Sequence, residues 1–128
     1  MNTMRKGSML VVDDQPNSIA VATQVLRTLG YADIDRATSV EEAYNQIVNK
    51  RYAAVFCDWH MPMANGLQLL QELEQRFPRE RPKFYFLTID KNWGRMADAR
   101  TNGADGFIVK CTRPILLKEK IAKALEAA

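Results

Sequence analysis

Charged and hydroxyl residues follow short apolar segments at separate places along the chain. Asp13 and Asp14 follow MLVV, Asp58 follows AAVFC, Thr88 follows KFYFL, and Lys110 follows GFIV. Carboxylate oxygens are the ligands that Mg²⁺ prefers, and a carboxylate can also act as a nucleophile. An ammonium and a hydroxyl can stabilise phosphoryl oxygens. If brought together, these residues have the chemistry to hold a divalent cation and to carry a phosphoryl group on an aspartate.

The apolar segments predict β-strands, and helical patterns separate them. Strands are expected over residues 9–12, 31–36, 53–58, 83–88 and 106–109, and helices over residues 19–29, 39–49, 67–77, 92–102 and 114–125. This alternation indicates βαβ units, and therefore an α/β fold with a doubly wound, five-stranded parallel sheet and five helices. The carboxyl ends of the strands would open into one crevice, where we expect the residues above to converge.

Local signals add detail to this pattern. Gly30 is expected to end the first helix in the left-handed conformation, and Ser39 with Glu42 has the spacing of a capping box that opens the second helix. Gly66 is expected to supply a turn before the third helix. The segment 31–36 is polar, which favours an edge position in the sheet. The residues of the last helix that are expected to face inward are Ile115, Leu117, Ile121, Ala124 and Leu125.

Length and composition indicate one small domain. The chain has 128 residues, of which 47% are hydrophobic, enough for a single core. No apolar stretch could span a bilayer, so we expect no membrane partner. The start, MNTMRKGS, lacks the apolar run of a signal peptide. We expect residues 1–7 to form a flexible tail.

The cysteine content and the net charge limit the cellular location and the partners that we expect. Cys57 lies in an apolar strand and Cys111 lies beside Lys110, so they give no disulfide framework and fit a reduced, cytoplasmic location. The formal net charge is only +3. Basic residues gather late in the chain, and we interpret them as a solvated face. We therefore expect no direct contact with nucleic acid.

Taken together, the motifs resemble those of a known family. The acidic pair, the segment D-W-H-M-P-M-x-x-G, the strand-end threonine and the segment N-G-A-D-G-F-I-V-K resemble, in order and spacing, the receiver domain of two-component response regulators. The resemblance extends from about Met9 to the end of the chain. It implies a flavodoxin-like sheet with strand order 2-1-3-4-5. It also implies a stand-alone, CheY-like receiver over residues 1–128 with no effector domain.

The same resemblance implies roles for the acidic residues. Asp58 would be the phosphoacceptor, loaded by a sensor histidine kinase. Asp14 and Asp58 would bind Mg²⁺ directly, Asp13 would act mainly through a bound water, and the backbone carbonyl of His60 would complete the protein ligands. The protein would catalyse only its own phosphorylation and dephosphorylation, and so would not be an enzyme in the usual sense.

A conformational switch is also implied. Lys110 would neutralise the phosphoryl oxygens, and Thr88 would donate a hydrogen bond to them, drawing the end of the fourth strand inward. Phe107 could then fill the vacated space, or it could be ordinary strand packing. A downstream protein would bind the face made by the fourth helix, the fifth strand and the fifth helix. Trp93, in the fourth helix, is a candidate for that surface, although we favour a partly buried packing role.

Besides the polar segment 31–36, two single positions depart from the family pattern. Ile89 follows Thr88 where receivers usually carry a small residue, so we expect its branched side chain to crowd Asp58 and to slow both loading and hydrolysis. Cys111 follows Lys110 where the family usually has proline after a cis peptide bond, which leaves the geometry of this loop open. We interpret Cys111 as a passive thiol, with a redox sensor as the alternative.

Other functions fit the sequence less well. A phosphorelay shuttle to a histidine phosphotransfer domain would use the same site, whereas a phosphorylation-independent interaction module would follow only if Ile89 and Cys111 spoil it. An FMN carrier needs a hydroxyl- and glycine-rich phosphate loop, but the loop after the first strand is acidic. An aspartate-nucleophile phosphatase would want a second aspartate at the position of His60.

Overall fold

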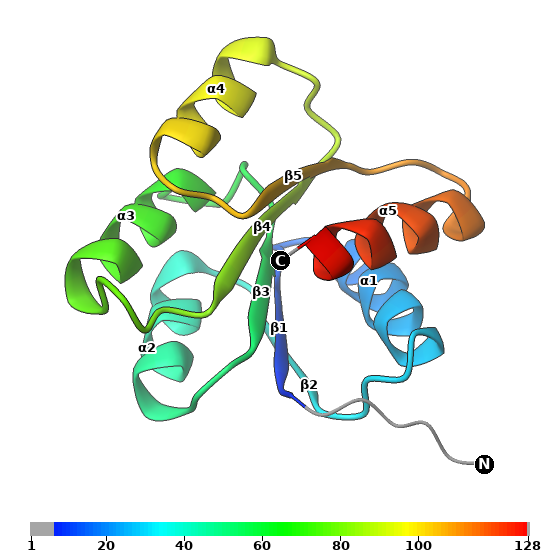
Figure 1. Ribbon diagram of the computed structural model, residues 1–128, viewed down its shortest axis with the longest axis horizontal. Helices are drawn as coiled ribbons and strands as arrows, with labels where there is room; N and C mark the ends of the chain where they lie inside the picture. Colours follow the sequence, from blue (N-terminus) through cyan, green and yellow to red (C-terminus); the bar gives the residue numbers. More distant parts are fainter. Residues whose placement is uncertain (1–6, 128) are drawn as a thin grey trace.

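The computed structural model describes residues 7–127, so the flexible tail predicted over residues 1–7 lies, apart from Gly7, outside the described residues. Strands and helices alternate along the described chain (Figure 1). The elements are β1 (Met9–Val12), α1 (Pro16–Thr28), β2 (Ile34–Ala37), α2 (Val40–Asn49), β3 (Ala54–Cys57), α3 (Gly66–Arg76), β4 (Lys83–Thr88), α4 (Trp93–Thr101), β5 (Gly106–Val109) and α5 (Pro114–Ala127). The predicted α/β fold is therefore confirmed.

The described strands form one parallel sheet in the order β2-β1-β3-β4-β5, as expected. Its register decides which strand ends are neighbours. Val12 lies beside Cys57, so Asp13 and Asp58 leave adjacent strands at the same level. Thr88 lies beside Val109, so the chain reaches Lys110 directly after the end of β4. The carboxyl edge of the sheet thus gathers side chains that are far apart in sequence.

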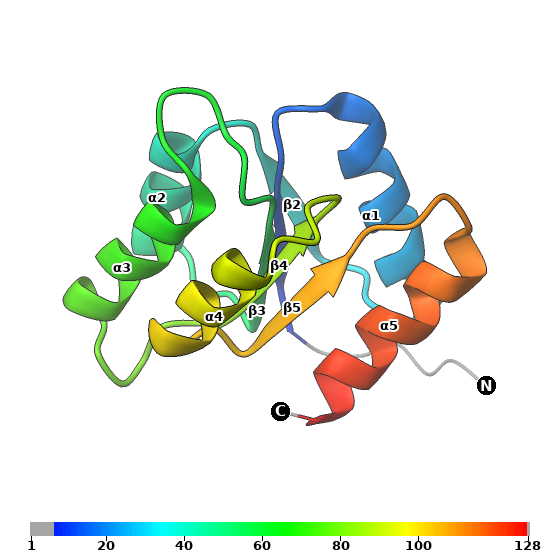
Figure 2. The ribbon, with the colours of Figure 1, turned by 90° about the horizontal axis from the view of Figure 1, so that it is seen from above.

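Helices cover both faces of the sheet: α1 and α5 lie on one side, and α2, α3 and α4 on the other (Figures 1 and 2). Alternate residues of each strand therefore enter different cores. In β1, Leu10 and Val12 pack with α2 and α3, whereas Met9 and Val11 pack with α1 and α5. Burial on both faces explains why the central strands are apolar without interruption.

The edge position predicted for the second strand is confirmed, but the strand is shorter and begins later than the predicted segment 31–36. Its polar residues are used at the edge. The Asp35 carboxylate accepts hydrogen bonds from the Tyr52 hydroxyl at 2.6 Å and from Lys50 Nζ at 2.8 Å. These hydrogen bonds tie the edge strand to the segment before β3. A strand that is buried on both faces would be held by apolar packing instead.

Helix ends match the sequence signals in part. Gly30 has φ of 104°, as predicted for the end of α1. Ser39 Oγ accepts a hydrogen bond from the Glu42 amide at 3.1 Å, but Glu42 Oε1 bonds the amide of Thr38, not that of Ser39. The predicted capping box is therefore only half formed. A complete capping box, which the sequence reading missed, opens α3 through Asn65 and Gln68.

Several apolar side chains are more exposed than expected. Trp93 is 83% exposed, so the partly buried packing role favoured for it is wrong. The reason is that α4 buries only Ala99 among its described residues. Ile115 is 74% exposed and does not face inward, whereas Leu117 and Ile121 are buried as predicted. None of the helices in the described part of the chain is long and apolar enough to cross a membrane.

Candidate functional site

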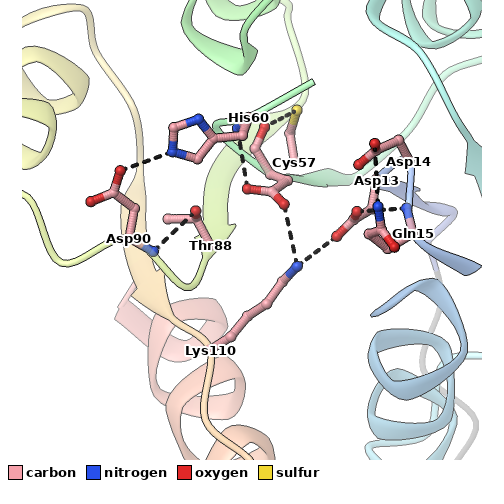
Figure 3. Close-up of polar contacts among 9 residues, drawn as sticks. Asp13, Asp14, Gln15, Cys57, His60, Thr88, Asp90 and Lys110 are labelled. Carbon is pink, nitrogen blue, oxygen red and sulfur yellow. Dashed lines mark hydrogen bonds and ion pairs between the residues drawn. The ribbon is translucent and has the colours of Figure 1, made fainter. Parts of the chain in front are cut away.

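An ammonium group lies between two carboxylates at the carboxyl edge of the sheet (Figure 3). Lys110 Nζ is 2.6 Å from Asp13 Oδ2 and 3.4 Å from Asp58 Oδ2. Asp13 follows β1, Asp58 follows β3 and Lys110 follows β5, so the sheet order alone brings them to one place. The structure therefore assembles the cluster that the strand-end positions predicted.

Asp13 is the buried member of this cluster. Only 3% of it is exposed, and its Oδ1 accepts a hydrogen bond from the Gln15 amide at 3.0 Å. Burial raises the pKa of its carboxyl above the usual value of 3.8, because a buried charge loses its hydration. The hydrogen bonds from Lys110 and Gln15 act in the opposite direction without cancelling that effect.

Asp58 reaches an open groove. Its side chain retains 12% of its exposure, and it lines a groove of about 850 Å³ together with Asp14, Ile89 and Arg95. The β3–α3 loop, residues 58–65, supplies most of the lining of this groove. A small molecule can therefore approach the Asp58 carboxylate from solvent with Asp14 beside it, whereas Asp13 lies behind, against Lys110.

Thr88 ends β4 and is completely buried. Its Oγ1 accepts a hydrogen bond from the Asp90 amide at 3.3 Å (Figure 3), and its carbonyl accepts one from the Lys110 amide at 2.8 Å. The hydroxyl proton of Thr88 is not used in these bonds. Thr88 is thus tied through its main chain to Lys110, so a movement of one residue would be transmitted to the other.

Phe107 packs among aromatic rings of the neighbouring strands. It is half-buried, and its ring centroid lies 5.9 Å from that of Phe86 and 6.4 Å from that of Trp59. Trp59 follows Asp58 and is itself buried. The ring of Phe107 therefore contacts the residue next to Asp58, while its strand leads directly to Lys110.

His60 contributes through its main chain and its ring separately. Its amide donates a hydrogen bond to Asp58 Oδ1 at 3.2 Å. Its ring points to the β4–α4 loop, where Nε2 lies 2.9 Å from Asp90 Oδ2 and 2.8 Å from Arg95 Nη1 (Figure 3 shows the contact with Asp90). The sequence placed Arg95 only on a candidate partner surface and did not single out Asp90, because no motif or spacing relates these two residues to the strand-end residues.

Two further residues fit closely behind Asp58. A Cβ on Gly66 would lie 2.5 Å from the Asp58 carbonyl oxygen and 3.1 Å from Cys57 Sγ. Close approach, and not the turn conformation predicted from sequence, is therefore the reason for glycine at this position. The Cys57 thiol is buried and donates to the Asp58 carbonyl at 3.2 Å, and burial raises the pKa of this thiol well above its usual value.

Comparison with known proteins decides the family. The sequence model of the response regulator receiver domain family matches residues 9–122 of this chain. The chain belongs to the response regulator receiver family. Receiver domains of this type act in two-component signalling, and they are signalling proteins rather than enzymes in the usual sense.

Relatives that the chain covers over most of their length share its sequence, and a solved structure shares its fold. The chain is 32% identical to the chemotaxis protein CheY1 of Helicobacter pylori strain J99, covering 91% of this chain and 95% of that protein. It is 29% identical to a CheY homologue of Campylobacter jejuni, with 91% of each covered. The structure of CheY4 of Vibrio cholerae shares the fold, with a TM-score of 0.80 at 21% identity, covering 95% of this chain and 99% of that one.

The receiver's acidic edge has donors that suit Mg²⁺. Receiver domains bind this cation, and a structure of the response regulator TrrA of Thermotoga maritima, 30% identical over 93% of this chain and 99% of that one with a TM-score of 0.79, is a complex with Mg²⁺ and BeF. Among the described residues no three His, Cys, Asp or Glu side chains form a complete metal cage. Mg²⁺ does not require one, because it keeps several waters and takes one or two carboxylates. The carboxylates of Asp14 and Asp58, which line one open groove, are of the type that such a site would use.

The positions that depart from the receiver pattern lie beside this groove. Ile89 is 74% exposed and lines the groove of Asp58, as well as an apolar depression that it shares with Cys111 and Lys110. No peptide bond within residues 7–127 is cis, so the bond between Lys110 and Cys111 is trans. Lys110 nevertheless reaches both Asp13 and Asp58. The loop geometry that the sequence left open is thus compatible with the cluster.

Proposed function

We propose that Asp58 is the phosphoacceptor of this receiver and that a sensor histidine kinase is the donor. The observation that supports this most strongly is the position of the Asp58 carboxylate, which faces an open groove in front while Lys110 Nζ lies 3.4 Å behind it. Asp13 and Asp14 are also carboxylates of this edge, but Asp13 is buried against Lys110. Asp58 therefore combines access for a donor with an adjacent cation.

The proposed reaction moves a phosphoryl group from nitrogen to oxygen. A carboxylate oxygen of Asp58 attacks phosphorus, a P–O bond forms, and the N–P bond of the phosphohistidine breaks. The electron pair of that bond stays with the leaving imidazole, which takes up a proton. The Lys110 ammonium, which already contacts Asp58, is placed to stabilise the negative charge on the phosphoryl oxygens.

Mg²⁺ would lie on the groove side of Asp58. We assign Asp14 and Asp58 as direct ligands, because both line the groove, and Asp13 as a ligand through water, because its carboxylate is held by Lys110 and the Gln15 amide. The carbonyl of His60 would be a further ligand. When bound there, the ion would supply positive charge that offsets repulsion between an anionic donor and this acidic edge.

The output would travel from Thr88 to the exposed face of α4, β5 and α5. The buried Thr88 hydroxyl would donate to the phosphoryl group, which would pull on the end of β4 and on the Lys110 amide bonded to it. Phe107 packs beside Phe86 of β4 and would respond. Trp93, 83% exposed on α4, would then be part of the surface that a downstream protein reads.

Because Cys57 and Cys111 are both free thiols, we propose that the protein acts in the cytoplasm.

The test is phosphorylation by a small donor. The protein is incubated with acetyl phosphate, with and without Mg²⁺, and its intact mass is measured beside that of Asp58→Asn. We expect a phosphoryl adduct that needs Mg²⁺ and is lost in Asp58→Asn. Asp98→Asn, which removes an exposed carboxylate on α4, should keep the adduct. An adduct that persists in Asp58→Asn would contradict the assignment. No adduct in the wild-type protein would favour a phosphorylation-independent interaction module.

A further inference from the structure

A cluster of charged and polar side chains spans the groove beside Asp58 and has no role in the function proposed above. His60 Nε2 lies 2.9 Å from Asp90 Oδ2 and 2.8 Å from Arg95 Nη1, and Arg95 also forms an ion pair with Asp90. His60 belongs to the β3–α3 loop, Asp90 to the β4–α4 loop, and Arg95 to the first turn of α4. The contacts therefore join separate segments across the groove. We call this cluster, His60, Asp90 and Arg95, the loop bridge.

Each end of the loop bridge is fixed by contacts of its own. Asp90 Oδ1 accepts from the Asn92 amide at 2.9 Å, and Asn92 Oδ1 caps α4 by accepting from the Arg95 amide at 3.2 Å. The guanidinium of Arg95 also lies 5.8 Å from the centre of the Trp59 ring. Because these groups are already ordered, His60 meets a preformed ion pair, and its ring loses freedom without ordering the partners as well.

The contacts of the His60 ring depend on which of its nitrogens carries the proton. One ring nitrogen cannot donate to a carboxylate and accept from a guanidinium at the same time. If Nε2 carries the proton, His60 donates to Asp90; if it does not, His60 accepts from Arg95. The ion pair between Asp90 and Arg95 is present in either case, so each side chain holds the ring in one tautomer and holds the ring's partner in the other.

The other end of His60 faces the acceptor. Its amide donates to Asp58 Oδ1 at 3.2 Å, and its carbonyl belongs to the next peptide of the same short loop. The loop bridge also reaches Thr88, whose Oγ1 accepts from the Asp90 amide at 3.3 Å (Figure 3). An anchored ring restricts the rotation of the His60 main chain, and hence the directions of its amide and carbonyl groups.

We infer that the loop bridge positions the main chain of His60, and that Arg95 and Asp90 thereby act as positioning residues for the Mg²⁺ and phosphoryl site. This inference rests on the proposed function, because it concerns the same site. Arg95 and Asp90 act on the cation from outside its ligand shell, as the partners that orient ligands do in other metal sites. The loop bridge also links the position of α4 to the state of the acceptor loop.

The test is an Mg²⁺ titration followed by the amide NMR signals of the β3–α3 loop, which needs no phosphorylation. The variants are Arg95→Gln, which removes the ion pair, and Arg95→Lys, which keeps the charge. Arg100→Gln is the matched control, because Arg100 is an exposed arginine in the last turn of the same helix. Thermal unfolding of each variant separates a loss of Mg²⁺ affinity from a loss of stability.

We expect Arg95→Gln to weaken Mg²⁺ binding by about tenfold, the lower end of what losing an outer partner costs a metal site. Arg95→Lys should recover most of the affinity, Arg100→Gln should bind as the wild type does, and the His60 amide signal should shift in Arg95→Gln before any Mg²⁺ is added. An unchanged dissociation constant for Mg²⁺ in folded Arg95→Gln would overturn this inference but leave the proposed function standing. Failure of the wild-type protein to bind Mg²⁺ would overturn the proposed metal site and the inference with it.

Discussion

The Lys110 ammonium is anchored on the buried carboxylate of Asp13, with Nζ 2.6 Å from Oδ2. The partly buried carboxylate of Asp58, which lines the groove, is a second and longer contact, at 3.4 Å. In this state the Lys110 ammonium mainly offsets the negative charge of Asp13, which burial destabilises. The Asp58 carboxylate, which Lys110 contacts less closely, still faces the open groove. Transfer of a phosphoryl group to Asp58 would give Lys110 a stronger partner than Asp13.

The first prediction concerns pH and Asp13 in metal-free protein. Burial raises the pKa of Asp13 above its usual 3.8, so between that value and the folded pKa the native state binds more protons than the unfolded state. Stability due to this group is therefore complete below pH 3.8 and is lost as the pH rises through the window. We expect Asp13→Asn to be more stable than wild type at neutral pH and to lose this advantage below pH 3.8.

Urea unfolding with EDTA across the pH range measures this difference. Asp98→Asn, an exposed carboxylate on α4, serves as the control and should follow the wild-type curve. If Asp13→Asn were instead less stable at neutral pH, the pair with Lys110 would outweigh the cost of burying the Asp13 charge.

The second prediction separates metal binding from phosphoryl transfer. Lys110→Gln removes a positive charge beside Asp13 and Asp58, so Mg²⁺ should bind more tightly, by about 1 kcal/mol or more for charges this close. Phosphorylation at saturating Mg²⁺ should nevertheless slow by on the order of a hundredfold, because a donor to the phosphoryl oxygens is lost. Calorimetry and intact-mass kinetics measure the two effects.

Lys123→Gln on α5 removes an exposed lysine and should change neither quantity. Equal weakening of Mg²⁺ binding and labelling in Lys110→Gln would point to general disruption of the loop and would contradict the prediction.

The third prediction concerns the exposed side chain that shares the groove with Asp58. Ile89 is 74% exposed and lines that groove. We expect Ile89→Ala to accelerate, several-fold, both labelling by acetyl phosphate and hydrolysis of the phosphorylated protein, because donor and attacking water approach from the same side. Loss of adduct after removal of the donor gives the hydrolysis rate.

Ile115→Ala is a close control, because Ile115 is also 74% exposed but lies on α5. Both rates should stay unchanged there. A hydrolysis rate that does not move in Ile89→Ala would show that the branched side chain does not hinder the site.

The fourth prediction concerns packing behind Asp58. In Gly66→Ala the new Cβ would lie 2.5 Å from the Asp58 carbonyl oxygen and 3.0 Å from the Phe86 ring, so the start of α3 must shift. We expect a loss of about 1–3 kcal/mol in the free energy of unfolding, as for other overpacked positions. Gly94→Ala on α4 should be much milder, since its Cβ would approach only the Asn92 side chain, at 3.1 Å. Denaturant melts compare them, and equal losses would argue against a special role for Gly66.

Much of the fold followed from local pattern. The apolar segments predicted β1, β3 and β4 well, because burial on both faces demands continuous apolar residues. The segment of β5, at the other edge of the sheet, is also apolar, although only Ile108 is fully buried in it. The edge strand β2 was placed less accurately, since an exposed edge leaves a weak apolar signal. The exposure of Trp93 was also missed. Whether a large apolar side chain is covered depends on how a helix seats on the sheet, which its own spacing does not determine.

By itself the sequence determined which chemistry stands at the strand ends, because the carboxyl ends of parallel strands must meet at one edge. Only the tertiary structure decided the pairing within that set. Lys110 contacts Asp13, 97 residues away along the chain, more closely than it contacts Asp58. The contacts of the His60 ring with Asp90 and Arg95 were likewise invisible in the sequence. Such pairs depend on register, rotamer and burial, which are fixed only when the helices and loops pack against the sheet.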